Sequence, residues 1–279
     1  MLTSIEVSSP SAREVLVLPL EESEDPLQRI DYFVRNIDGI DPVKASFSSI
    51  EMAHSDGVFI QNTSLDSRNI VINISPNPDY IDKTVQALRG NLYRYFMPKN
   101  HVTIRFVDDT VVAREISGIV ESFETSIFSK EPSFTISILC PNPNFSSIEE
   151  SVKTFQTTAQ SERTELLYSG SSETGVVLRM LATTPLSDFR FEIQSENGVI
   201  QTFTYNGHIP VNNAIVIDTN FRKRRIHLVT GSVSKTVLYN VSTQSVWPQL
   251  YPGSNLIRVY TIAVPQTYTL TYTNKFGGL

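Results

Sequence analysis

The histidines and acidic side chains are the residues whose chemistry could bind a metal ion, and their spacing decides whether they do. His54, His101, His208 and His227 are scattered singly, and none has a second histidine or a carboxylate at a metal-ligand spacing. The acidic run at residues 21–25 lacks both the ligand spacing and the glycine of a calcium loop. The sequence therefore predicts no metal site.

Nucleophilic and acid–base catalysis also lack a supporting arrangement. The stretch Gly170–Gly175 superficially resembles a nucleophile elbow, but the Gly-x-Ser-x-Gly spacing fails because Thr174 occupies the fifth position. Neither a glycine-rich phosphate loop nor a dinucleotide fingerprint is present. We interpret the carboxylates of one loop-rich region as turn and cap acids: Asp38, Asp41, Asp56 and Asp66. The sequence predicts no enzyme and no cofactor, and a hydrolase hidden in the fold is a rival without a visible nucleophile and base.

Two features could bind a partner. The first is a run of four basic residues, called here the basic patch: Arg222, Lys223, Arg224 and Arg225. The patch could bind an anionic polymer or an acidic protein, but we favour a solvated entry to a strand, because four basic residues in an acidic chain are a weak footprint. The second is Trp247 with Tyr251, which could stack on a sugar, although packing in a core is the commoner fate of such a pair.

Composition limits the class of protein. A chain of 279 residues predicts about two domains. The net charge of −6 and the isoelectric point near 5.3 argue against a dedicated nucleic-acid binder. The single cysteine excludes an intrachain disulfide and indicates folding in a reducing cytosol. No stretch approaches the roughly 20 apolar residues that span a bilayer, so we expect no membrane insertion.

The first half of the chain alternates apolar and polar residues, which is the period of half-buried strands. Such alternation marks residues 70–74, 102–106 and 134–140. Cys140 shares one strand face with Phe134 and is expected to be a buried, inert thiol.

The only convincing helix is predicted at residues 77–96. Asn77 would cap it, and an apolar stripe would face the sheet, formed by Ile81, Val85, Leu88, Leu92 and Tyr95. Gly90 in its middle predicts either a close neighbour or a bend.

The second half reads as an antiparallel β-sandwich. Short strands are expected at residues 176–181, 189–193, 199–205, 214–217, 226–229, 237–241 and 255–260. Asn-Gly pairs at 197–198 and 206–207 predict hairpins. The predicted domains are residues 1–145, which are β-rich with one helix, and the sandwich at 176–279, with a linker at 146–175. The last strand of the sandwich is a candidate to pack back on the first domain.

Two parts of the chain resemble the distal tail protein family of long-tailed, siphovirus-type bacteriophages. In the first half the similar motifs are Ile37-Asp38-Gly39 at a strand end, Asp56-Gly57 before an aromatic-bearing strand, and Arg68-Asn69-Ile70-Val71-Ile72 leading into a helix. In the last third they are Ile217-Asp218, Trp247 before Leu250, the turn Pro252-Gly253-Ser254-Asn255, and Gly278-Leu279.

The resemblance implies a mainly β protein with a ring-forming N-terminal domain, one α-helix and a galectin-like C-terminal sandwich. It implies a structural adaptor without catalytic residues, which forms a homohexameric ring between the tail tube and the tail-tip or baseplate hub.

Implied partners are other copies of the chain, the tail tube protein, the hub protein and the tape measure protein. Receptor-binding proteins and host surface polysaccharide are further candidates. The implied location is the distal end of the tail in the virion, after assembly in the host cytoplasm. The alternative is a carbohydrate- or receptor-binding sandwich module that uses Trp247 and Tyr251.

Overall fold

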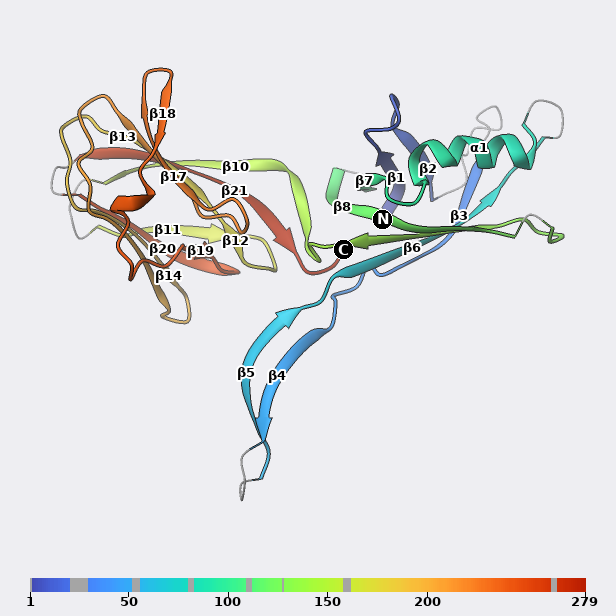
Figure 1. The fold of residues 1–279 in the computed structure, drawn as a ribbon, viewed down its shortest axis with the longest axis horizontal. Coiled ribbons are helices and arrows are strands. Elements are labelled where there is room, and N and C mark those ends of the chain that lie inside the picture. Colours follow the sequence, from blue (N-terminus) through green and yellow to red (C-terminus); the bar gives the residue numbers. More distant parts are fainter. Residues whose placement is uncertain are drawn as a thin grey trace. The chain divides into compact units, whose positions relative to one another are not determined.

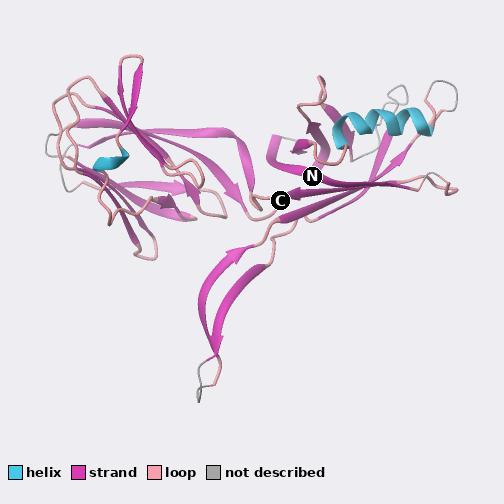
Figure 2. Ribbon diagram, in the orientation of Figure 1, coloured by secondary structure: helices cyan, strands magenta, loops and turns pink. Residues whose placement is uncertain are grey.

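The chain folds into two compact units, each described here by itself. Unit 1 comprises residues 1–148 and 277–279, and unit 2 comprises residues 149–276. The computed structural model describes residues 2–20, 30–51, 56–79, 83–108, 112–126, 128–157, 162–261 and 265–279, with the backbone alone for 112 and 113. Strands dominate the described residues of both units (Figures 1 and 2). The predicted mainly β fold is confirmed.

Unit 1 is built on one antiparallel sheet. Its elements are β1 (Leu2–Ser8), β2 (Leu16–Pro19), β3 (Tyr32–Asp38), β4 (Ala45–Glu51), β5 (Val58–Leu65), β6 (Arg68–Pro76), α1 (Val85–Phe96), β7 (His101–Asp108), β8 (Val112–Thr125) and β9 (Phe134–Cys140). The strands of the sheet follow the order β2-β1-β7-β8-β9-β6-β3, and β4 and β5 form a separate two-stranded sheet. The next strand, β10 (Phe145–Thr157), starts in unit 1 and continues into unit 2.

The alternation seen in the sequence places one face of the unit 1 sheet in a core. Side chains at every second position of β6, β7 and β9 are buried: Ile70, Ile72, Ile74, Val102, Ile104, Phe106, Phe134, Ile136, Ile138 and Cys140. Burial raises the pKa of the Cys140 thiol to about 11, against the weaker opposing effect of Arg68. The prediction of a buried cysteine is confirmed.

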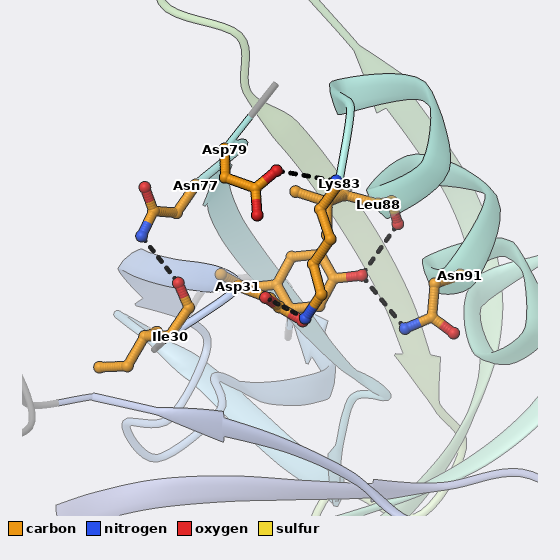
Figure 3. Close-up of polar contacts among 8 residues, drawn as sticks. Ile30, Asp31, Asn77, Asp79, Lys83, Leu88 and Asn91 are labelled. Carbon is orange, nitrogen blue, oxygen red and sulfur yellow. Dashed lines mark hydrogen bonds and ion pairs between the residues drawn. The ribbon is translucent and has the colours of Figure 1, made fainter. Parts of the chain in front are cut away.

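Helix α1 begins later than the sequence predicted. Thr84 is its N-cap, and its side chain accepts a hydrogen bond from the backbone N–H of Ala87 at 3.2 Å. Asn77 is not the cap, because the helix begins at Val85; the Asn77 side chain donates to the Ile30 carbonyl (Figure 3). Leu88, Leu92 and Tyr95 of the predicted stripe are buried, Val85 is half-buried, and Ile81 lies outside the described residues. A Cβ at Gly90 would meet nothing within 4 Å, so the expected close neighbour is wrong.

A polar cluster joins the start of α1 to the start of β3. Lys83 forms an ion pair with Asp31 at 2.7 Å (Figure 3). The Tyr32 hydroxyl donates to the Leu88 carbonyl at 2.9 Å and accepts from the Asn91 side chain at 3.2 Å. Burial raises the pKa of Tyr32 to about 12. These bonds satisfy the polar groups that the helix brings down onto the sheet.

Unit 2 is an antiparallel sandwich. Its further strands are β11 (Thr164–Tyr168), β12 (Thr174–Gly175), β13 (Val177–Leu181), β14 (Phe189–Ser195), β15 (Ile200–Tyr205), β16 (Ala214–Asp218), β17 (Arg225–Thr230), β18 (Val233–Thr236), β19 (Gln249–Leu250), β20 (Gly253–Tyr260) and β21 (Gln266–Phe276), with a 3-10 turn, η1, at Leu238–Asn240. One layer has the order β18-β17-β16-β13-β21, with β10 beside β21, and the other has β11-β20-β14-β15. Both layers contribute to one core, which contains Leu178, Ile217 and Leu270 from the first and Phe191, Phe203 and Ile257 from the second.

Three expectations for this half are corrected. Residues 237–241 hold η1 rather than a strand. Asn206-Gly207 does not close a hairpin, because β15 and β16 lie in different layers, whereas Asn197-Gly198 does connect β14 to β15, with Gly198 at φ +80°. The stretch 146–175, expected as linker, contains most of β10 and all of β11 and β12, because its Ser- and Thr-rich sequence pairs with neighbouring strands through the backbone.

Candidate interaction site

The hairpin of β4 and β5, called here the arm, is the part of unit 1 whose residues are all exposed. It forms a sheet of its own, and no other strand of the described chain pairs with it (Figure 1). An isolated two-stranded hairpin is marginally stable in water. The arm therefore has the composition and exposure of a segment that needs a partner.

The pairing in the arm gives it one apolar face. Residues opposite each other in an antiparallel pair lie on the same face. The pairs Ala45–Leu65, Phe47–Thr63, Ser49–Ile60 and Glu51–Val58 share this face. A β-bulge between Ser48 and Ser49 is needed for that arrangement, because the extra residue in β5 shifts Ile60 and Val58 onto the side of Leu65. We call this set the apolar face of the arm.

The apolar face carries large side chains that water reaches. Phe47 is 61% exposed and Ile60 is 50% exposed. The opposite face pairs Ser46 with Ser64 and Ser48 with Asn62, and becomes apolar only at Ile50 and Phe59. Contiguous exposed apolar surface marks interaction sites. The sequence contained part of this signal as the apolar run at residues 58–60, but the polar serines hid the first strand.

The members of the basic patch differ in their secondary structure and in their contacts. Arg222, Lys223 and Arg224 lie in the turn between β16 and β17, and Arg225 begins β17. Arg225 Nε lies 3.4 Å from the buried carboxylate of Asp218, while the Arg222 guanidinium lies over the ring of Phe221 at 5.4 Å. All four side chains are exposed, so the patch remains a candidate for an anionic partner, with one of its charges already paired.

Trp247 and Tyr251 are half-buried in unit 2. The Trp247 ring packs on Phe203 with 5.0 Å between centroids, against the core of the sandwich. Burial raises the pKa of Tyr251, whose backbone N–H donates to the Asn255 side chain. Within the described residues the two rings form no pair with each other, which favours the packing interpretation over a sugar platform.

The described residues offer little else that could hold a ligand. Among them no group of three His, Cys, Asp or Glu side chains is placed to hold a metal ion, and His54 and residues 21–25 lie outside them. No helix in the described part of the chain is long and apolar enough to cross a membrane. An open depression of about 630 Å³ lies where β1 ends and β7 and β8 run past each other, lined by Ser8, Ser9, His101, Thr103, Ser117 and four apolar or proline side chains with Gly118.

Residues 169–276, which make up most of unit 2, match the model of the siphovirus-type tail component, C-terminal domain. This segment is therefore similar to the C-terminal domain of siphovirus-type tail components. Its sandwich therefore supports the resemblance to distal tail proteins that the sequence motifs indicated. No curated protein matches the chain.

Solved structures extend the likeness beyond the siphovirus-type tail component domain. The Dit protein of phage SPP1, described as a paradigm of the hub adsorption apparatus in phages that infect Gram-positive bacteria, covers 88% of this chain. The match spans 94% of the SPP1 protein, at 18% identity and a TM-score of 0.65, and shows a shared fold. A chain of the phage P2 baseplate in its activated conformation matches over 100% of both chains, at 8% identity and a TM-score of 0.45.

Proposed function

We propose that this chain is a distal tail protein that forms a hexameric ring between the tail tube and the tail-tip or baseplate hub. The observation that carries the proposal is the unpartnered arm of unit 1, in a chain whose residues 169–276 match the model of the siphovirus-type tail component, C-terminal domain. In the ring, the arm of each copy packs on the next copy.

The apolar face of the arm is exposed to water in the single chain. Leaving Phe47, Ile60 and Val58 in water forgoes the free energy that their burial would supply. A contact between the arm of one copy and a different surface of the next is heterologous, and repeating it closes a ring when the rotation from copy to copy completes a full turn. The same arrangement covers exposed strand edges, which otherwise promote aggregation. The order of six comes from the resemblance to distal tail proteins.

Further partners follow from the position of such a ring. The tube protein and the hub protein would bind its two sides, and the tape measure protein and later DNA would pass through its centre. Receptor-binding proteins or host polysaccharide would bind outward-facing surfaces, among which the basic patch is a candidate. The ring would be located at the distal end of the tail and would assemble in the host cytoplasm.

The test is the mass of the full chain in solution. Six copies of 31.3 kDa predict a particle of roughly 190 kDa by light scattering at micromolar concentration. A strict monomer, both alone and with its hub partner, would contradict the proposal and favour a binding module.

Variants of the arm sharpen the test. Replacing Phe47 and Ile60 together by Thr removes two large side chains of the apolar face and puts in a residue that suits strands. We expect this variant to be monomeric and folded. The control is Ser48→Thr with Ser64→Thr on the opposite face, which should remain a ring. Equal masses for the two variants would show that the apolar face makes no contact between copies.

A further inference from the structure

Arg68 lies next to the arm and is the most completely buried charged residue among those that the structure describes. It is the first residue of β6, three positions after the arm ends, and it is 1% exposed. Arginine is almost never fully buried unless its donors are satisfied. Its burial therefore requires a dedicated set of acceptors.

The acceptors of Arg68 are backbone carbonyls from three segments that lie far apart in sequence. Nε donates to the Pro143 carbonyl at 2.7 Å, and one terminal nitrogen donates to the carbonyls of Gly39 and Asp41, the latter at 2.6 Å. The other terminal nitrogen donates to the Gly277 carbonyl at 2.5 Å. The guanidinium also lies over the Phe145 ring at 4.5 Å. A planar fork with five donors can reach all of these groups at once, whereas a lysine ammonium cannot.

The segment that contains Gly39 and Asp41 and the segment that contains Gly277 meet where the chain enters the arm. Residues 39–44, called here the arm root, connect β3 to β4. The backbone N–H of Leu279 donates to the Ile40 carbonyl at 3.1 Å, and the Arg114 side chain donates to the Gly278 carbonyl. Gly39 adopts φ +85°, and a Cβ there would lie 1.9 Å from the Asn69 carbonyl oxygen, so other residues are excluded. The arm root is thus tied to β6 and to residues 277–279.

We propose that Arg68 and residues 277–279 form a latch that fixes the arm root and so sets the direction in which the arm leaves unit 1. Arg68 is a positioning residue, since it contacts the root and not the apolar face. Its effect on assembly rests on the proposed ring, in which an arm must meet the next copy at a set angle. The root itself is held whether or not the ring forms.

Hydrogen exchange on the full chain tests the latch. Arg68→Lys keeps the charge but loses the fork. We expect the backbone amides that donate to carbonyls of the arm root, Asp66 to Lys44 and Leu279 to Ile40, to exchange on the order of tenfold faster, as for the loss of one hydrogen bond to a charged group. Amides of β7 and β8 should exchange as in the unchanged chain. The control is Arg35→Lys, an exposed arginine of the same unit whose Nε donates to Ser75 Oγ at 2.8 Å.

A second variant covers the case in which Arg68→Lys does not fold. Removal of Gly277, Gly278 and Leu279 takes away one carbonyl acceptor of Arg68 and the bond to Ile40, so exchange at the Asp66 amide, which donates to the Lys44 carbonyl, should rise as well. Exchange at the Asp66 amide that stays at the level of the Arg35→Lys control in both variants overturns the latch.

Light scattering on the same samples tests the consequence for assembly. The ring of six copies has a mass of roughly 190 kDa. Faster exchange at the arm root together with loss of this species supports the proposal. Faster exchange with an intact ring overturns the claim that the latch directs the arm. A monomeric unchanged chain would contradict the proposed ring instead, and the exchange data would then decide the latch alone.

Discussion

The arm of unit 1 and the β14–β15 hairpin of unit 2 are built alike and end in opposite environments. Both are antiparallel two-stranded ribbons that gather apolar residues on one face. In the sandwich, Phe191 faces Phe203 across the ribbon, and both are buried against the first layer. In the arm, Phe47 and Ile60 lie on one face with no cover from the described chain. Strand pairing thus specifies an apolar face, and only the surroundings decide whether this face becomes core or interface.

We expect the largest effect on stability from a substitution in the buried β14–β15 hairpin, and almost none from the matching substitution in the arm. Phe191→Ala should lower the free energy of unfolding of unit 2 by about 3–5 kcal/mol, because it leaves a cavity in the core. Phe47→Ala should change stability by less than about 0.5 kcal/mol at a concentration where the chain is monomeric. Denaturant unfolding followed by circular dichroism measures both. A large loss for Phe47→Ala in the monomer would mean that the arm is covered within its own chain.

The next largest effect on stability is expected from Cys140, on the buried face of the unit 1 sheet. Cys140→Ser should lower the free energy of unfolding by about 1–3 kcal/mol, since a buried hydroxyl would lack a good partner. Cys140→Ala adds no hydroxyl and separates that penalty from lost packing. Thiol labelling of the native chain should be far slower than of free cysteine, and fast labelling would show that the face is open.

Alkaline pH should weaken the same covered face. The pKa of Cys140 is about 11 in the folded chain against an ordinary value of 9.0. The folded state therefore holds the thiol proton more tightly, and its contribution to stability is complete below pH 9 and is lost as pH rises toward 11. The slope of unfolding free energy against pH in that window should be smaller for Cys140→Ala. Equal slopes would show that the thiol is not desolvated.

The smallest effect concerns a glycine that faces water. Gly90→Ala in α1 should raise the free energy of unfolding by up to about 1 kcal/mol, because an added Cβ meets nothing and alanine favours a helix. Gly118→Ala in β8 is the control and should destabilise, since its Cβ would lie 2.6 Å from Ile138 Cγ2. A loss of stability at Gly90 would reveal a neighbour that this structure does not contain.

Much of the fold could be predicted because burial leaves a period in the sequence. Ile70, Ile72 and Ile74 indicated β6, and Asn197-Gly198 indicated the β14–β15 turn. The helix start was misplaced because Asn77 and Thr84 are both good caps, and only the structure shows that the Thr84 side chain accepts the bond from the first turn. Asn206-Gly207 failed for a related reason: a turn signal does not state which layer the next strand joins.

The candidate site was less predictable than the fold. The basic patch and Trp247 drew attention because of their residue types, yet Arg225 pairs with Asp218 and Trp247 packs on Phe203. The arm drew none, because Ser46, Ser48 and Ser49 interrupt its hydrophobic pattern, and the bulge that gathers Ile60 with Leu65 depends on register.

By itself, the sequence determined the mainly β class, the buried faces of the long strands, the burial of Cys140 and the resemblance to distal tail proteins. These properties depend on neighbours a few residues apart, whose period and turn chemistry are written locally. Only the tertiary structure decided that Arg68 collects carbonyls from residues 39, 41, 143 and 277, and that the arm has no cover in the described chain. Those outcomes depend on which distant segments come together, and hydrogen bonds to backbone carbonyls leave no mark on the residue types that supply them.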